Sequence, residues 1–305
     1  MAFQDYIATE IATDAADGIL TRREALRRLA LLGLSAGAAT ALLAACGGDD
    51  DGGTPTGSGP PAETQTTASS TTTTGPAPIE TNLITFKGPR GDLTGSFAAA
   101  EDPKGAVLII HENRGLTPHF VSLPGRLASS GYSALAVDLL SEEGGTAGLG
   151  DEAKAQAALS AAPRERLVAD GRAGIDELER RAPGQKLGMM GFCFGGGMTW
   201  SVLAAPEPRL AAAVPFYGPL PDGAAFTGAK AAVLAVYAGL DTRVNGSRDA
   251  AVAALQAAGL VHEVKTYDGV DHAFFNDTGA RYNPVAAGQA YDALLDWFGR
   301  YLYEA

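Results

Sequence analysis

The sequence predicts a three-layer α/β fold over residues 79–305, with a mostly parallel central sheet and helices on both faces. Short apolar runs alternate with longer segments of helical periodicity along this part of the chain. Several runs, such as 106–110, are apolar at every position, as expected for central strands that helices cover on both sides. A cysteine between glycines follows another of these runs, a pattern typical of a sharp turn from a strand into a helix.

The expected elements begin with two strands that pair antiparallel at one edge of the sheet, and β-α repeats follow them. In such sheets the functional groups lie beyond the carboxyl ends of the parallel strands. The expected strands are Asn82–Lys87, Leu93–Ala99, Ala106–His111, Ser133–Leu139, Lys186–Phe192, Ala211–Tyr217, Ala231–Tyr237 and His262–Tyr267. The expected helices are His119–Ser129, Asp151–Ala161, Arg164–Arg181, Gly195–Ala204, Arg248–Ala258 and Val285–Tyr303.

The first 78 residues are predicted to lie outside this fold. Thr21–Arg27 resembles a twin-arginine export signal, and the uncharged run 29–45 is rich in Ala and Leu. The run ends in Leu43-Ala44-Ala45-Cys46, which resembles the cleavage box of a bacterial lipoprotein with Cys46 as the lipidated residue. We therefore expect a signal peptide at 1–45. The mature protein would be held by lipid on the outer side of the bacterial cytoplasmic membrane, in the periplasm or at the cell surface. The alternative is an uncleaved membrane anchor, for which a run of 17 residues is short.

Residues 46–78 are rich in Gly, Asp, Thr, Ser and Pro, and we expect them to form a flexible tether. The chain has two cysteines, so lipid on Cys46 would leave Cys193 without a disulfide partner. An unpaired thiol in an exported protein favours a functional role. The formal charge is −12, and no basic cluster lies outside the signal segment, which argues against nucleic acid as a partner.

Gly191-Phe192-Cys193-Phe194-Gly195-Gly196 has the pattern of a nucleophile elbow, with cysteine where serine is usual. The turn holds its apex residue in a strained backbone conformation, and small neighbours let the strand and the helix approach each other. The sulfur of Cys193 would stand above the sheet, where the N-terminus of the following helix favours the thiolate. The alternative is a buried, inert cysteine in a glycine-rich turn.

A nucleophilic thiol needs a base, and the base needs an orienting acid. Asp241 and His272 follow Cys193 in that order, each in the loop after an expected strand and at the same edge of the sheet. Each also has a plainer interpretation: Asp241 as a helix cap or turn carboxylate, and His272 as a structural loop histidine. Their agreement in order and position favours a triad of Cys193, His272 and Asp241.

The remaining histidines are expected to be surface or structural residues. His119 lies in the first turn of a helix, and His262 lies at the start of a strand. The segment His111-Glu112-Asn113-Arg114-Gly115 lacks the second histidine of the zinc helix motif, and no His/Cys cluster indicates a metal. The glycines after Cys193 lack the Lys-Ser/Thr of a phosphate loop, and no dinucleotide fingerprint follows an early strand. We therefore expect neither a metal nor a cofactor.

Four motifs occur in order between residues 80 and 303: His111-Glu112-Asn113-Arg114-Gly115, Gly191-Phe192-Cys193-Phe194-Gly195-Gly196, Gly239-Leu240-Asp241 and Asp271-His272-Ala273-Phe274-Phe275-Asn276-Asp277. Together they resemble the dienelactone hydrolase family (carboxymethylenebutenolidases). The resemblance implies the α/β-hydrolase fold, with Cys193 as nucleophile, His272 as base and Asp241 as orienting acid.

The resemblance also assigns roles to residues of the first motif. Glu112 matches the family's glutamate that contacts the resting thiol and helps to generate the thiolate when substrate arrives. A plainer interpretation is a strand-end carboxylate paired with Arg114. The backbone N–H groups of Phe194 and Asn113 match the family's oxyanion hole.

The chain departs from the family pattern at the positions that bind the substrate. The dienelactone enzyme binds the carboxylate of its substrate with two arginines, and the corresponding positions here hold Glu142 or Glu143 and Asn276. Arg281 and Arg114 are the candidates to replace those arginines. An acidic rim would repel a dicarboxylate-like ligand, which argues against dienelactone itself as the substrate.

These expectations combine into a hydrolase of small esters or lactones that forms a thioester on Cys193, needs no cofactor and contacts the membrane through Cys46. The Gly-rich, acidic stretch 142–151 would form either a mobile rim of the pocket or a solvated surface loop. One alternative is a general carboxylesterase or polyester hydrolase of the same fold. Another is a surface lipoprotein that keeps the fold to bind a ligand. The oligomeric state is open, with a monomer favoured.

Overall fold

The computed structural model describes residues 3–46 and 77–303, and its core is an eight-stranded sheet. The strands are β1 Asn82–Lys87, β2 Asp92–Ala98, β3 Ala106–Ile110, β4 Ser133–Asp138, β5 Leu187–Phe192, β6 Leu210–Phe216, β7 Ala232–Ala238 and β8 His262–Tyr267. They are arranged in the order β1-β2-β4-β3-β5-β6-β7-β8. β1 pairs antiparallel with β2, β2 pairs antiparallel with β4, and the remaining neighbours are parallel. The predicted mixed edge and parallel body are confirmed.

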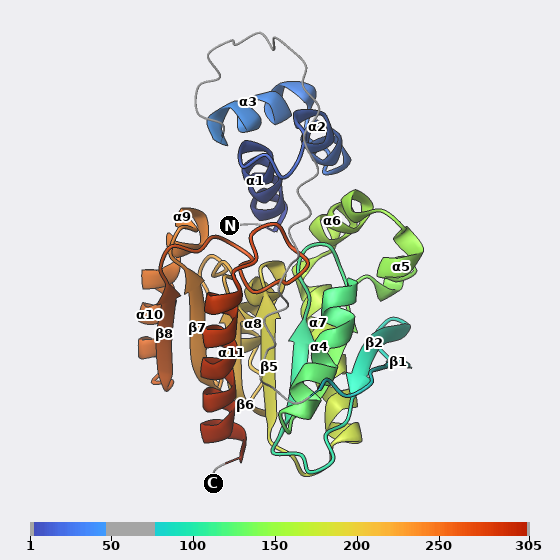
Figure 1. Ribbon diagram of the computed structural model, residues 1–305, viewed down its shortest axis with the longest axis vertical. Coiled ribbons are helices and arrows are strands. Elements are labelled where there is room, and N and C mark those ends of the chain that lie inside the picture. The colour runs from blue at the N-terminus through green and yellow to red at the C-terminus, as the bar shows by residue number, and fades with distance from the viewer. Residues whose placement is uncertain (1–2, 47–76, 304–305) are drawn as a thin grey trace, which may run out of the picture.

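Helices cover both faces of the sheet, which confirms the three-layer prediction. The helices on the faces are α4 Pro118–Ser129, α7 Arg164–Arg181, α8 Phe194–Ala204, α10 Arg248–Ala257 and α11 Pro284–Phe298, whereas α6 Glu152–Ala161 lies beyond the carboxyl ends of the strands. Figure 1 shows α4 and α11 in front of the sheet and α7 and α8 behind it. α4 packs on β2 and β4, α11 on β6 and β7, α7 on β3 and β4, and α8 on β5 and β6.

Short helical turns occupy loops at the carboxyl ends of the strands. η1 (Ser141–Glu143) and α5 (Thr146–Leu149) follow β4, and α9 (Thr242–Asn245) follows β7. The C-terminal helix that the sequence predicted over 285–303 is divided, because the α-helix ends at Phe298 and Gly299–Tyr303 form the π-helical turn η2. Gly299, a poor helix former, stands at this junction.

The middle of the sheet holds the core and fixes the edge at which the loops meet. Every residue of β3, β4, β5 and β7 is buried. Burial of each Val, Leu or Ile side chain contributes roughly 1.5–3 kcal/mol, so these strands are firmly held in the core. The carboxyl ends of the parallel strands therefore form a rigid platform below the loops that carry Cys193, Asp241 and His272.

Residues 3–46, which the sequence analysis placed outside the fold, form three helices packed on it: α1 Phe3–Ala16, α2 Arg22–Leu31 and α3 Ala36–Cys46. Figure 1 shows α1 above the loops at the carboxyl ends of the strands, with α2 and α3 farther from the sheet. Tyr6, Ile7 and Ile11 of α1 are fully buried. Apolar side chains at helical spacing give α1 a face that packs on the α/β domain, whose first strand begins at Asn82.

The segment that resembles an export signal begins α2. Arg22 and Arg23 are exposed, whereas Arg28 is buried. Nη1 of Arg28 donates a hydrogen bond to Oε1 of Gln156 in α6 at 3.1 Å, which ties the N-terminal helices to the α/β domain. This packing does not test whether residues 1–45 act as a signal peptide, which stays a prediction.

The apolar run 29–45 is divided between α2 and α3. In α3, Ala39 and Leu43 are buried and most of the other side chains are exposed. No helix in the described ranges is both long enough and apolar enough to cross a membrane. Cys46 ends α3, and most of the predicted tether, residues 47–76, lies outside the described residues.

The stretch predicted to be a mobile rim or a solvated loop is held to the domain by ion pairs. Nε of Arg90 donates a hydrogen bond to Oε1 of Glu142 at 2.7 Å. Nη2 of Arg166 donates to Oε2 of Glu143 at 2.9 Å. Both arginines also pair with the buried Asp170, so two guanidinium groups serve three carboxylates, and the acidic rim stays a prediction.

Candidate active site

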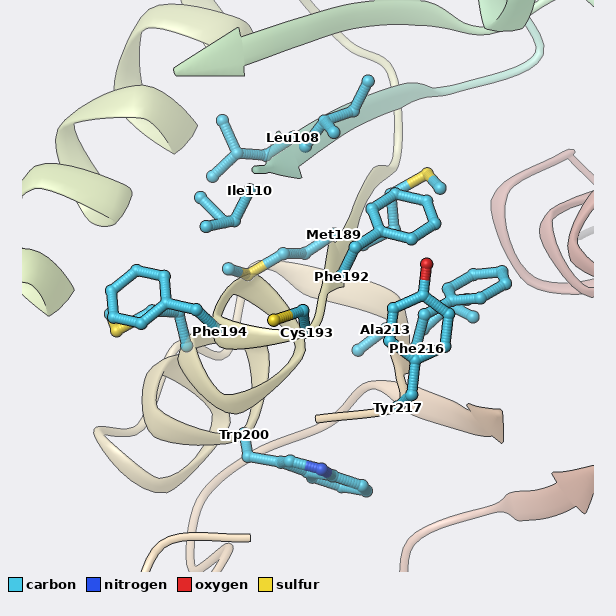
Figure 2. Packing of buried hydrophobic residues seen from close by; sticks show 14 of the residues in the cluster. Leu108, Ile110, Met189, Phe192, Cys193, Phe194, Trp200, Ala213, Phe216 and Tyr217 are labelled. Atoms are coloured by element: carbon cyan, nitrogen blue, oxygen red, sulfur yellow. The ribbon is translucent and has the colours of Figure 1, made fainter. Parts of the chain in front are cut away.

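Cys193 stands at a strained turn between β5 and α8, as Figure 2 shows. Its φ of 58° and ψ of −119° lie in a region that residues with side chains rarely adopt. A Cβ on Gly191 would lie 2.1 Å from the carbonyl oxygen of Gly195, and a Cβ on Gly195 would lie 2.3 Å from that of Ile110. Only glycine fits at these two positions, so the sequence of the turn determines the close approach of strand and helix.

Asp241 and His272 form a buried pair at the same edge of the sheet. Nδ1 of His272 donates a hydrogen bond to Oδ2 of Asp241 at 2.5 Å. The other carboxylate oxygen, Oδ1, accepts from the backbone N–H of Val244 at 3.1 Å and caps α9. Asp241 is therefore both a helix cap and the partner of the histidine, with one oxygen for each.

Aromatic packing fixes the loop that carries His272. The ring of Phe275 lies 5.0 Å from that of Phe192 and 5.3 Å from that of Phe216, measured between centroids. Phe192 and Phe216 stack at 4.6 Å. Since Phe192 directly precedes Cys193, one aromatic cluster holds both the thiol turn and the histidine loop.

Backbone strain is concentrated around this site. In the described ranges, the residues other than glycine with positive φ are Cys193, Tyr217 at 35° and Ala273 at 63°. Tyr217 follows β6, and its ring lies 5.0 Å from the His272 ring. Strain of this kind persists where the surrounding structure over-determines the backbone, and it clusters at functional sites.

The polar groups nearest to the thiol come from α1. The hydroxyl of Tyr6 donates to Sγ of Cys193 at 3.4 Å and lies 3.3 Å from Nε2 of His272. Sγ lies 3.3 Å from Oε2 of Glu10, and Oε1 of Glu10 lies 3.8 Å from Nε2 of His272. Cys193 is 1% exposed and His272 is 3% exposed. α1 therefore closes the site from solvent.

Cys193, His272 and Glu10 also bring three metal-ligating groups together. Sγ, an imidazole nitrogen and a carboxylate oxygen lie within 4.8 Å of one another. The sequence analysis did not anticipate this group, because Glu10 is remote from the other two in the chain. The thiol would have to lose its proton before these residues could hold a cation.

Glu112 lies in the site, but its oxygens are bound elsewhere than at the thiol. Nδ2 of Asn276 donates to its Oε2 at 2.9 Å, and the hydroxyl of Tyr217 donates to its Oε1 at 3.4 Å. Burial raises the pKa of Glu112, and the hydrogen bond from Asn276 opposes that shift. In the described part of the chain, the carboxylate at hydrogen-bonding distance from Sγ is that of Glu10. The resemblance implied that Glu112 contacts the resting thiol of Cys193. In the structure Glu10 makes that contact instead.

The two positions expected to supply the oxyanion hole flank the thiol turn. Phe194 is the first residue of α8, and Asn113 lies in the loop after β3. Oδ1 of Asn113 accepts from Nε2 of Gln156 at 3.4 Å. Its buried Nδ2 has no hydrogen-bond partner among the described residues. An unpaired buried donor at this place is consistent with a site that a ligand completes.

The arginines expected to replace the family's carboxylate-binding pair both face α1. Nη1 of Arg281 donates to Oδ1 of Asp14 at 2.8 Å, and Arg281 also pairs with Asp17. Nη2 of Arg114 lies 3.6 Å from Oδ2 of Asp14, and its Nη1 lies 3.5 Å from Glu152. Carboxylates of the N-terminal segment thus occupy both guanidinium groups.

Burial and the charges of α1 set the protonation of the site. Burial raises the pKa of Cys193 well above its ordinary value, and the charge of Glu10 adds to this. Burial alone would lower the pKa of His272, but the charges of Asp241 and Glu10 outweigh it and raise that pKa. Burial would raise the pKa of Glu10, but His272 and Arg243 lower it. These shifts favour the protonated thiol over the thiolate that the helix N-terminus alone would favour.

The remaining histidines are structural, as expected, although not all lie at the surface. His111 is fully buried, and its Nε2 accepts from the backbone N–H of Leu139 at 3.1 Å. His119 is buried as well, and its Nδ1 lies 2.6 Å from Oδ1 of Asp277 in the His272 loop. His262 begins β8 and bonds to nearby backbone.

Four residues of the site were not predicted from the sequence: Tyr6, Glu10 and Asp14 in α1 and Arg243 in α9. Tyr6, Glu10 and Asp14 follow one another at intervals of four residues, a spacing that places them on one face of a helix and could have indicated that helix. Nothing in the local sequence indicates what that face contacts.

Comparisons with known proteins show the family of this chain. The sequence profile of the dienelactone hydrolase family matches residues 93–302. A Salmonella typhi protein provisionally named carboxymethylenebutenolidase is 29% identical over 243 residues, which are 73% of this chain and 88% of that protein. An Escherichia coli O157:H7 protein with the same provisional name is 30% identical over 219 residues, covering 66% of this chain and 79% of that protein.

The fold agrees as well. A crystal structure from Klebsiella pneumoniae, provisionally described as a dienelactone hydrolase, superimposes with a TM-score of 0.65 at 28% identity and covers 74% of this chain and 100% of that chain. The described α/β domain thus has the α/β-hydrolase fold of that structure. On the extent of the family match, the chain belongs to the dienelactone hydrolase family.

Proposed function

We propose that this protein hydrolyses small esters or lactones through a thioester on Cys193, with His272 as general base and Asp241 as the orienting acid. One observation carries the proposal: a cysteine at a strained strand-to-helix turn shares a buried edge with a hydrogen-bonded histidine–aspartate pair. This is the arrangement that nucleophilic acyl transfer needs.

In the first half-reaction, His272 accepts the proton of the Cys193 thiol, and the thiolate attacks the carbonyl carbon. The oxyanion that forms is stabilised by the backbone N–H groups of Phe194 and Asn113. The carbon–oxygen bond to the leaving group then breaks, and the leaving oxygen takes the proton from His272. In the second half-reaction, His272 takes a proton from water, the hydroxide adds to the thioester, and the departing Cys193 thiolate takes that proton back from His272.

Esters and lactones are the substrate class that this chemistry favours. A thiolate leaves readily, so the tetrahedral intermediate goes forward only when the alkoxide or enolate leaves more readily still. Activated esters and enol-lactones meet that condition better than amides do. Since Glu142 and Glu143 pair with Arg90 and Arg166, the test includes substrates with and without a carboxylate.

A panel of p-nitrophenyl esters and lactones, with and without a carboxylate, tests the proposal on the full chain carrying Asp14→Arg, which breaks the contact of α1 with Arg281. We expect turnover that Cys193→Ala abolishes while Cys46→Ser leaves it unchanged. Since Cys46 is the other cysteine in the chain, it is the matched control. Full turnover in Cys193→Ala would contradict the mechanism.

We also keep, as a proposal from the sequence, that Cys46 is lipidated after export and that the protein is anchored outside the cytoplasmic membrane. Cleavage before Cys46 would separate α1, α2 and most of α3 from the α/β domain. Intact mass of the membrane-extracted protein measures this directly. A chain that keeps its N-terminal residues and carries no lipid would contradict the proposal.

A further inference from the structure

We propose that α1 is an intramolecular inhibitor of the catalytic site and that the protein becomes active when α1 leaves it. The loss of activity that this implies depends on the proposed hydrolase function. The closure of the thiol by α1 does not depend on that function and can be measured separately.

The inhibitory face of α1 is one stripe of side chains, Tyr6, Glu10 and Asp14, spaced one helical turn apart. Tyr6 and Glu10 contact the thiol and the histidine, and Asp14 binds arginines at the rim. Ile7 and Ile11 are fully buried beside this stripe. The helix is thus fixed by apolar burial and presents three polar groups to the site.

Tyr6 occupies the place where a substrate would react. Its hydroxyl bridges Sγ of Cys193 and Nε2 of His272, at 3.4 and 3.3 Å. An ester oxygen that leaves, or a water that attacks, has to lie between these same two atoms. The Tyr6 ring also lies 4.4 Å below the guanidinium of Arg243, so the space beside the triad is filled as well. Substrate and Tyr6 cannot bind together.

Glu10 opposes the chemistry electrostatically. Its carboxylate accepts from the Cys193 thiol, and it lies 3.7 Å from Nη1 of Arg243. A negative charge there disfavours the thiolate and favours protonation of His272, which opposes the transfer of the thiol proton to His272 that attack requires. While α1 is in place, Tyr6 blocks the site and Glu10 opposes formation of the thiolate.

Ion pairs away from the thiol hold α1 in position. Asp14 is 2% exposed and lies between Arg281, at 2.8 Å, and Arg114, at 3.6 Å. Asp17 pairs with Arg281 as well. A positive charge at position 14 would face two arginines in a buried setting, which strongly disfavours docking. This position can therefore release α1 without altering a residue that touches the reacting atoms.

The test compares Asp14→Arg with Asp5→Arg, both in a Cys46→Ser background of the full chain. Asp5 is exposed on the same helix, so its substitution makes the same charge change without breaking a contact to the domain. Two quantities are measured with EDTA present: the rate of Cys193 alkylation by iodoacetamide and the turnover of p-nitrophenyl acetate. Both should rise about tenfold or more in Asp14→Arg and stay at the parental value in Asp5→Arg.

Tyr6→Ala is the second variant, because it removes the blocking group without a change of charge. Thermal unfolding followed by circular dichroism shows which of the two variants remains folded. One folded variant is enough for the test. Alkylation at the parental rate in a folded Asp14→Arg or Tyr6→Ala protein overturns the proposal. Faster alkylation without any ester turnover supports closure by α1 and contradicts the hydrolase function instead.

Discussion

The hydroxyl of Tyr6 lies 3.4 Å from the sulfur of Cys193, although 187 residues separate them in the chain. The same hydroxyl lies 3.3 Å from the imidazole of His272. A residue from the extreme N-terminus thus stands between the two groups that would have to exchange a proton. Substitutions at this contact therefore test both the chemistry of Cys193 and His272 and the docking of α1.

Glu10→Gln should move the pH profile of Cys193 alkylation to lower pH. Burial and the charge of Glu10 both raise the pKa of the thiol, so removing that charge lowers it. Weaker docking of α1 would act in the same direction by exposing the thiol to water. Iodoacetamide rates between pH 5 and 10 in the Cys46→Ser background measure the shift, in about the range where thiols ionise.

Asp5→Asn is the control for this experiment, because it removes one negative charge from an exposed position of the same helix. It should leave the profile where it is. A profile in Glu10→Gln that does not move, or that moves to higher pH, would show that Glu10 does not hold the thiol neutral.

Asp241→Asn should separate the two roles of this residue. An asparagine oxygen can still accept from the backbone N–H of Val244, so α9 stays capped and stability changes little. The imidazole loses a charged acceptor at Nδ1, which lowers the pKa of His272 and favours the wrong tautomer. We expect kcat to fall by roughly 10²–10⁴-fold while the melting temperature stays close to that of the parent. Unchanged kcat in a folded Asp241→Asn protein would contradict its role as the orienting acid of His272.

Cys193→Ser should keep the fold and hydrolyse poorly. The site is built around a thiol, and a serine hydroxyl ionises far less readily in the same buried place. We expect ester turnover to fall by roughly 10²-fold or more in the Asp14→Arg background, where α1 no longer limits access. If the serine variant turned over esters as fast as the cysteine protein, the site would not be specialised to ionise a thiol. That result would also count against a role for Glu112 in generating the thiolate.

Gly195→Ala and Gly288→Ala should change stability in opposite directions. A Cβ at Gly195 would lie 2.3 Å from the carbonyl oxygen of Ile110 and 2.5 Å from that of His111. The turn must shift, at a cost of roughly 1–3 kcal/mol or more in the free energy of unfolding. Gly288 is exposed in α11 with nothing within 4 Å of such a Cβ, so alanine there should stabilise by about 0.5–1 kcal/mol. Urea unfolding of both variants checks this, and a neutral Gly195→Ala would contradict the packing of the turn.

The strands of the sheet could be predicted because each one is determined by the pattern of apolar residues within its own short segment. The run 106–110 is apolar at every position and is buried at every position in β3. The strand over 262–267 was predicted with the bounds that it has as β8. The cysteine turn is local too, since the spacing of Gly191 and Gly195 about Cys193 requires the geometry seen in the structure.

The surroundings of the thiol could not be predicted because they depend on distant contacts. Glu10 and Arg243 meet only in the folded chain, and the helix that carries Glu10 was interpreted as part of an export signal. The same limit applies to Glu142 and Glu143, whose pairing with Arg90 and Arg166 the local sequence does not indicate. For Glu112, the family motif correctly placed the side chain in the site but did not predict its hydrogen-bond partners, Asn276 and Tyr217.

The most direct test of the account is to trap the covalent intermediate. Asp14→Arg protein in the Cys46→Ser background is mixed with p-nitrophenyl acetate, quenched in acid and digested, and the peptides are examined by mass spectrometry. The account predicts an acetyl group on the peptide that contains Cys193, labile to hydroxylamine, appearing before steady-state release of acetate. Acetate release with no adduct on that peptide, or with the adduct on Tyr6 or another residue, would contradict it.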